Sequence, residues 1–178
     1  MTDSPIQGRP IHIRPIHLDH EADALARITL AVYLDEFGSL PDDYIAELTD
    51  VRGRVGEAVV LVAVDHEATV LGGITYLDRP GPLASIDGPH QAELRMLAVA
   101  PESQGRGVGT ALVHACLDRA RADSKRQVLL HTATSMVKAQ RLYERAGFRR
   151  SEARDLVVEG GVGDGGIHLL AYVLDLQG

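Results

Sequence analysis

The spacing of hydrophobic residues divides the chain into segments with the period of strands and segments with the period of helices. Seven segments have the alternating or continuously apolar pattern of β-strands. They span residues 9–16, 58–64, 69–77, 93–99, 128–132, 148–158 and 167–176. Four helices are predicted between them, one capped by Asp19, one opened by Pro41, one after the glycines at 105–109 and one running from Ser135 to Gly147.

The order of these segments predicts the fold class. It reads strand, two helices, three strands, helix, strand, helix, two strands. Adjacent strands such as 58–64 and 69–77 form antiparallel hairpins, whereas strands joined through a helix can lie parallel. We therefore expect a single α/β domain over residues 9–178, with a mixed, largely antiparallel seven-stranded sheet and helices on both faces. Residues 1–8 are expected to form a flexible leader.

Composition and charge narrow the classes of partner. The chain has 178 residues, of which 45% are hydrophobic and 24% charged, and its net charge is −7. This acidic balance argues against nucleic acid as the main partner. No apolar run reaches the roughly 20 residues of a membrane span, and the N-terminus lacks a secretory signal. The only cysteine, Cys116, lies on the apolar face of a predicted helix, so we expect a core residue in a cytoplasmic protein.

A strand that leads through a glycine-rich turn into a helix carries the clearest chemical signal. Gly105, Gly107 and Gly109 leave the backbone open to a ligand. The first turn of the following helix offers free N–H groups and the positive end of the helix dipole, which suits a phosphate. The spacing excludes a dinucleotide fingerprint, because positions 110 and 112 are Thr and Leu, and the lysine of a P-loop is missing.

Two motifs around this turn resemble the GNAT superfamily of acyl-CoA-dependent N-acyltransferases. The first follows a strand of the form Glu-Leu-x-x-Leu-x-Val and reads Gln104-x-x-Gly107-x-Gly109. The second, one helix and one strand later, reads Ala139-x-x-Leu142-Tyr143-Glu144-x-x-Gly147-Phe148. The order of elements over residues 9–176 is similar to the fold of that family. The resemblance implies a GNAT-like fold and an acetyl-CoA-dependent N-acetyltransferase, in which a primary amine attacks the thioester directly in a ternary complex.

The resemblance also implies which residues bind acetyl-CoA, the cosubstrate. The glycine loop would wrap the pyrophosphate, and the backbone of the preceding strand would contact the pantetheine arm and the thioester. These residues are Leu97, Ala98, Val99, Gln104, Gly105, Arg106, Gly107, Val108, Gly109, Thr110, Met136, Ala139 and Tyr143. Met136 is a departure, because many members carry at this place an Asn that holds the pantetheine arm. Met cannot donate a hydrogen bond, and Thr134 or Ser135 could substitute.

Two residues are the catalytic candidates implied by the resemblance. Tyr143 matches the general acid that would protonate the leaving thiolate, and Glu93 matches a base that would take a proton from the amine. The alternatives are a core tyrosine and a glutamate without chemistry at a strand start, and Asp87 and His90 are weaker candidates for the base.

The acceptor side is less defined. In the family the acceptor, a small-molecule or peptide amine, enters opposite the cofactor. Tyr33, Glu36 and Phe37 could line that side, or they could form a solvated helix end. The family habit makes a homodimer an expectation.

Several other functions remain open or disfavoured. A module that binds acyl-CoA without turnover would keep the glycine loop, and a transferase for a longer acyl group would keep both motifs. The eight histidines are scattered without metal-ligand spacing, so we expect no metal site. Ser103 does not lie in a Gly-x-Ser-x-Gly nucleophile elbow, which disfavours a serine hydrolase.

Overall fold

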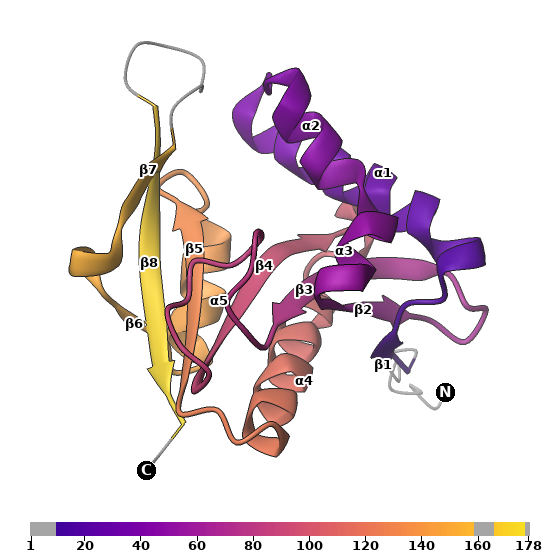
Figure 1. The fold of residues 1–178 in the computed structure, drawn as a ribbon. Coiled ribbons are helices and arrows are strands. Elements are labelled where there is room, and N and C mark those ends of the chain that lie inside the picture. Colours follow the sequence, from indigo (N-terminus) through magenta and orange to yellow (C-terminus); the bar gives the residue numbers. More distant parts are fainter. Residues whose placement is uncertain (1–9, 159–165, 177–178) are drawn as a thin grey trace, which may run out of the picture.

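The computed structural model describes residues 10–158 and 166–176. The expected leader and almost all of the Gly-rich segment before the last strand lie outside these residues. The strands are β1 His12–Pro15, β2 Val59–Val64, β3 Val70–Leu77, β4 Gln91–Val99, β5 Gln127–Ala133, β6 Arg149–Arg150, β7 Leu156–Val158 and β8 Ile167–Asp175. The helices are α1 Leu18–Phe37, α2 Asp42–Thr49, α3 Val51–Glu57, α4 Val108–Ala122 and α5 Val137–Arg145 (Figure 1). Two 3₁₀ turns, Pro101–Ser103 and Glu152–Arg154, complete the described part.

One sheet contains all the described strands, in the order β1-β2-β3-β4-β5-β8-β6, with β7 pairing to β8. The pair β4–β5 is parallel, and the other pairs are antiparallel. The predicted mixed, largely antiparallel sheet is therefore confirmed. It contains eight strands in place of the seven expected.

The additional strand arises because the segment predicted as one strand, residues 148–158, is interrupted. The carboxylate of Asp155 accepts a hydrogen bond from the backbone N–H of Ala171 on β8 at 2.9 Å, so a side chain takes the place of a ladder partner. Arg150 forms an ion pair with the same carboxylate at 2.5 Å and closes the turn at Glu152–Arg154. A local side-chain contact of this kind competes with strand pairing.

Helices cover both faces of the sheet, as expected (Figure 1). On one face, Ala22 and Leu25 of α1 and Val51 of α3 pack against the alternate residues Val60 and Val62 of β2. The opposite face packs against α4 and α5 in a larger core. Cys116 of α4 is fully buried there, which confirms it as a core residue, and burial raises the pKa of its thiol to about 12.

The N-terminal region differs from the prediction in two details. Helix α1 begins at Leu18, so Asp19 lies inside the first turn, and Glu21 instead accepts a hydrogen bond from the backbone N–H of His17 at 2.8 Å. The second difference is α3, which is absent from the sequence prediction because it is short and contains two glycines. Its start is fixed by Asp50, whose side chain accepts from the N–H of Gly53 at 2.8 Å.

Candidate active site

The sheet divides between its two parallel strands. β4 and β5 pair only from Gln91–Leu94 to Gln127–Leu130, and beyond this point they separate (Figure 1). β4 remains paired to β3 on its other edge, and β5 remains paired to β8 as far as Ala133. The facing edges of residues 95–99 and 131–133 are therefore not part of any ladder. A ligand with amide groups can pair there in the manner of an added strand.

A β-bulge lies at the start of this division. Thr75 pairs with Arg95 and Gly73 with Ala98, so Met96 and Leu97 of β4 oppose the single residue Ile74. Met96 has φ +54°, in the left-handed region that non-glycine residues rarely occupy. A bulge re-aims the backbone of its strand, and here it does so on the edge that faces the gap.

The glycine-rich turn follows β4 and leads into α4. Gly105 and Gly107 have φ +75° and +81°, so both require the conformational freedom of glycine, and Gly107 is the N-cap of α4. No side chain caps this helix end, and the first N–H to be used is that of Ala111, which donates to the carbonyl of Gly107 at 2.9 Å. The three preceding amides, residues 108–110, face outward from the helix end. This is the arrangement that binds anions.

A cavity of about 760 Å³ runs along the turn and into the gap between β4 and β5. Its walls contain eleven of the thirteen residues predicted to bind the cofactor: Leu97, Val99, Gln104, Gly105, Gly107, Val108, Gly109, Thr110, Met136, Ala139 and Tyr143. Ala98 is not among the lining residues, because alternation along a strand directs its side chain away from Leu97 and Val99. Arg106 is exposed on the turn and does not line the cavity.

A second cavity of about 610 Å³ lies on the other side of the gap. The two cavities share six lining residues, so they adjoin at the split in the sheet: Tyr33, Arg95, Met96, His131, Thr132 and Met136. Of the residues expected on the acceptor side, Tyr33 lines both cavities, Phe37 lines the second one and Glu36 lines the larger one. The centroids of the Tyr33 and Phe37 rings are 6.1 Å apart, and Tyr44 packs edge-on against Tyr33.

Tyr143 lies on α5 at the wall of the larger cavity and is 7% exposed. Its ring packs against Phe148 and Tyr172, with centroid distances of 6.0 and 6.4 Å. Burial raises the pKa of this phenol, so its hydroxyl keeps its proton throughout the neutral range. Tyr143 is thus a core residue that also lines the larger cavity.

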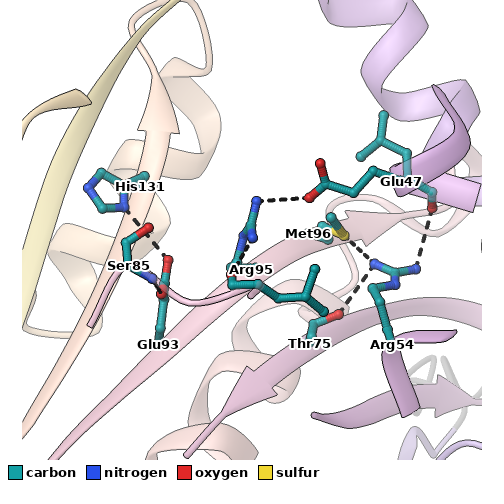
Figure 2. A network of polar contacts seen from close by, with 10 residues as sticks. Glu47, Arg54, Thr75, Ser85, Glu93, Arg95, Met96 and His131 are labelled. Atoms are coloured by element: carbon teal, nitrogen blue, oxygen red, sulfur yellow. Dashed lines mark hydrogen bonds and ion pairs between the residues drawn. The ribbon is translucent and has the colours of Figure 1, made fainter. Parts of the chain in front are cut away.

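Glu93 and His131 meet across β4 and β5 at the second cavity, as Figure 2 shows. The carboxylate of Glu93 is buried, accepts a hydrogen bond from the backbone N–H of Ser85 and lies 3.8 Å from Nδ1 of His131. Nε2 of His131 donates to the carbonyl of Arg154 at 3.0 Å, because a carbonyl can only accept. The lone pair of the neutral imidazole is therefore on Nδ1, and a proton taken up there would face a carboxylate.

His131 is the main site residue that the sequence prediction missed. The sequence shows a histidine in a largely apolar strand, which is a signal for a site residue. It does not show that strand pairing brings this histidine next to Glu93. The weaker candidates lie elsewhere: Asp87 is 91% exposed in its side chain, and neither it nor His90 lines either of these two cavities. Among the substitutes considered for the missing Asn, Ser135 lines the larger cavity and Thr134 does not.

Two properties of the described residues bear on the class of protein. Over residues 10–158 and 166–176, no group of three or more His, Cys, Asp or Glu side chains could hold a metal ion. Within the same ranges, no helix combines the length and apolarity that a bilayer crossing requires.

Comparison with known proteins identifies relatives of this chain. The family model of the acetyltransferase (GNAT) family matches residues 22–148. A mycothiol acetyltransferase of Sanguibacter keddieii is 33% identical over 126 residues, which are 68% of this chain and 39% of that protein. An uncharacterised N-acetyltransferase of Schizosaccharomyces pombe is 28% identical over 80% of this chain and 85% of its own length. The chain thus spans well under half of the mycothiol acetyltransferase.

Solved structures share the fold. The acetyltransferase yncA from Salmonella typhimurium, a complex with acetyl-CoA, has a TM-score of 0.70 at 23% identity and covers 93% of this chain and 94% of its own. A GNAT-family acetyltransferase from Staphylococcus aureus Mu50 has a TM-score of 0.74 at 16% identity, with 94% and 100% covered. At these identities the likeness extends to the fold alone.

Proposed function

Because the chain belongs to the GNAT family of acetyltransferases, we propose that it transfers an acetyl group from acetyl-CoA to a primary amine in a ternary complex. The observation that carries this proposal is the meeting of two cavities at the split between β4 and β5. Two substrates that enter from opposite sides would react there directly, because a thioester in one cavity and an amine in the other would meet at the shared residues.

The larger cavity supports acetyl-CoA as the cosubstrate. The amides at the N-terminus of α4 suit the pyrophosphate, and the free edge of β4 suits the amides of the pantetheine arm. An N–H of the bulged segment at Met96 and Leu97 would then donate to the thioester oxygen. Negative charge grows on that oxygen as the amine attacks, so a fixed donor stabilises the transition state.

Tyr143 and the pair Glu93–His131 supply the proton transfers in this proposal. The ammonium group first gives a proton to Nδ1 of His131, directly or through water, while Glu93 stabilises the imidazolium, and the free amine nitrogen then attacks the thioester carbon. The C–S bond breaks, and the thiolate receives a proton from the hydroxyl of Tyr143. The second proton that the nitrogen loses as the amide forms restores the phenol of Tyr143 through water. The desolvation that raises the pKa of this phenol also raises the proton affinity of a thiolate formed beside it, so the transfer remains feasible.

The second cavity favours a cationic amine with an apolar body as the acceptor. Three aromatic rings, of Tyr33, Phe37 and Tyr44, form one wall, and apolar side chains of β7 and β8 form another. The acidic residues Asp43, Glu47 and Glu93 outnumber the one arginine, Arg95, which is itself paired with Glu47 at 3.1 Å. An ammonium group is attracted to this wall and is delivered beside Glu93 and His131.

The test is release of free CoA from acetyl-CoA in the presence of a panel of primary amines. We expect turnover to be greatest with amines that carry an aromatic or aliphatic body. Tyr143→Phe removes one hydroxyl and preserves the ring packing, so it should lower kcat about 10²-fold or more with little change in CoA binding. Arg141→Met, a change of an exposed residue on the same helix that lines neither cavity, is the matched control.

The rival function, acyl-CoA binding without turnover, predicts a different result from the same panel. Tight binding of CoA with no release of thiol on any amine would refute the transferase and support the binding module. A series of acyl-CoA thioesters separates acetyl transfer from transfer of longer acyl groups. A transferase for longer acyl groups would show a kcat/KM that rises with chain length.

A further inference from the structure

Arg54 is buried behind the β-bulge without an acidic partner. It lies on α3 and is 3% exposed. Its guanidinium donates to the sulfur of Met96, to the hydroxyl of Thr75 at 3.3 Å and to the carbonyl of Leu48 at 3.4 Å. None of the ion pairs between described residues includes it, and its Nε has no hydrogen-bond partner within the described ranges.

This environment is unfavourable for a cation. A thioether is a weak acceptor, and the other two contacts are neutral groups at long hydrogen-bond distances. Burial lowers the pKa of Arg54, but a guanidinium keeps its charge at neutral pH. A buried charge that is incompletely compensated costs folding free energy, and an apolar side chain of similar size would be tolerated at least as well. The stability of the fold therefore gives no reason for an arginine at this position.

Two contacts of Arg54 lie at the bulge, one with the residue before it and one with a residue in it (Figure 2). Thr75 of β3 pairs with Arg95, immediately before the bulge, and Met96 is the bulged residue with φ +54°. One guanidinium thus connects the two strands at the point where their register shifts. Met96 also lines both cavities, so the same contact holds the backbone at the junction where the substrates would meet.

We propose that Arg54 is a positioning residue for acetyl transfer: it holds the bulge at Met96 in the geometry that aims the β4 backbone at the thioester oxygen. This role rests on the proposed function. The charge of Arg54, which has no acidic partner among the described residues, adds to this positioning. A cation behind the bulge favours the negative charge that develops on the thioester oxygen in front of the bulge. The chemical step then depends on Arg54, whereas binding of CoA, which is distributed along the whole cavity, does not.

Arg54→Met tests this inference, because methionine fills the space without charge or donors. We expect kcat to fall by about 10- to 100-fold, less than for removal of a direct oxyanion donor, with the Kd of CoA changed by less than about threefold. Hydrogen exchange of the amides of residues 95–98 should become faster in the unliganded protein. The melting temperature should stay equal or rise.

Two variants separate the role of Arg54 from a general effect of substitution. Arg52→Met is the matched control, since Arg52 lies on the same helix with a side chain 54% exposed, and it should leave kcat and exchange unchanged. Arg54→Lys keeps the charge and loses the fork of donors, so its kcat should lie between those of wild type and Arg54→Met.

The inference is wrong if Arg54→Met keeps the kcat of the Arg52→Met control. It is also wrong if the loss of rate accompanies a lowered melting temperature without faster exchange in β4, because the arginine would then be only structural. Wild-type protein that binds CoA and acetylates no amine would refute the proposed function instead. The exchange measurement still decides in that case whether Arg54 holds the bulge.

Discussion

Replacement of Glu93 by glutamine tests the proposed base, His131 with Glu93 beside it, because it removes only the charge of the carboxylate. Gln is isosteric with Glu, and its amide oxygen can still accept from the N–H of Ser85. The carboxylate lies 3.8 Å from Nδ1 of His131. At this distance and an effective dielectric constant of about 20, a carboxylate stabilises an imidazolium by about 4 kcal/mol. Loss of that stabilisation in the transition state corresponds to a decrease in kcat of about 10³-fold.

The assay is the initial rate of CoA release at saturating acetyl-CoA and amine, measured between pH 6 and 10. We expect Glu93→Gln and His131→Gln each to lose most of the wild-type rate at every pH in this range. The double variant should be no slower than the slower single variant, because the two residues act as one unit.

Asp87→Asn is the control for the removal of a carboxylate nearby. Its side chain is exposed in the loop before β4 and lines neither cavity, so its rate should equal that of the wild type. The reasoning is refuted if Glu93→Gln keeps kcat within about threefold of the wild type while folding normally, a difference below 1 kcal/mol. It is equally refuted if the two single losses multiply in the double variant.

Three further predictions concern stability and cofactor binding. Thr132→Val should stabilise the unliganded protein by about 1 kcal/mol in a denaturant titration, because the buried hydroxyl has no partner within the described residues; a loss of stability would contradict this. Gly109→Ala should weaken CoA binding by about 1–3 kcal/mol in calorimetry, since its methyl would lie 3.0 Å from Leu142 in the cavity wall; unchanged affinity would contradict this. Glu21→Gln should cost about 2 kcal/mol at pH 7, because Arg14 holds the pKa of Glu21 below its usual 4.5. A depressed pKa contributes stability above the unfolded value, so the deficit should disappear as the pH falls below 4.5; a constant deficit would contradict the ion pair.

The elements that the sequence predicts correctly are those whose pattern lies within a few neighbouring residues. Residues 59–64 and 70–77 are apolar enough to identify as strands, and Gly147 follows the end of its helix as expected, with φ of +97°. The segment 148–158 misled because its apolar residues suggested one strand. Its interruption depends on Asp155 contacting Ala171, which is sixteen residues away on β8.

The candidate site also has parts that the sequence predicts and parts that it does not. The glycine turn could be assigned because strand, turn and helix N-terminus are contiguous in the chain, and the amides that suit a phosphate belong to that stretch alone. Tyr143 could be named as a candidate because its motif is contiguous as well, and the structure places it at the wall of the larger cavity. The proximity of the Glu93 and His131 side chains could not be predicted, because it depends on the parallel register of β4 and β5, which are connected through α4.

The sequence by itself determined most of the order of elements, the mixed sheet and the glycine turn that leads into a helix N-terminus. Backbone propensity and hydrophobic period act over neighbouring residues, and these features need nothing more. Only the tertiary structure decided where the sheet splits, how the two cavities join, and that Arg54 lies without an acid behind Met96. These features depend on packing between segments far apart in the chain. There, the free energy of one side chain is set by neighbours that its local sequence does not reveal.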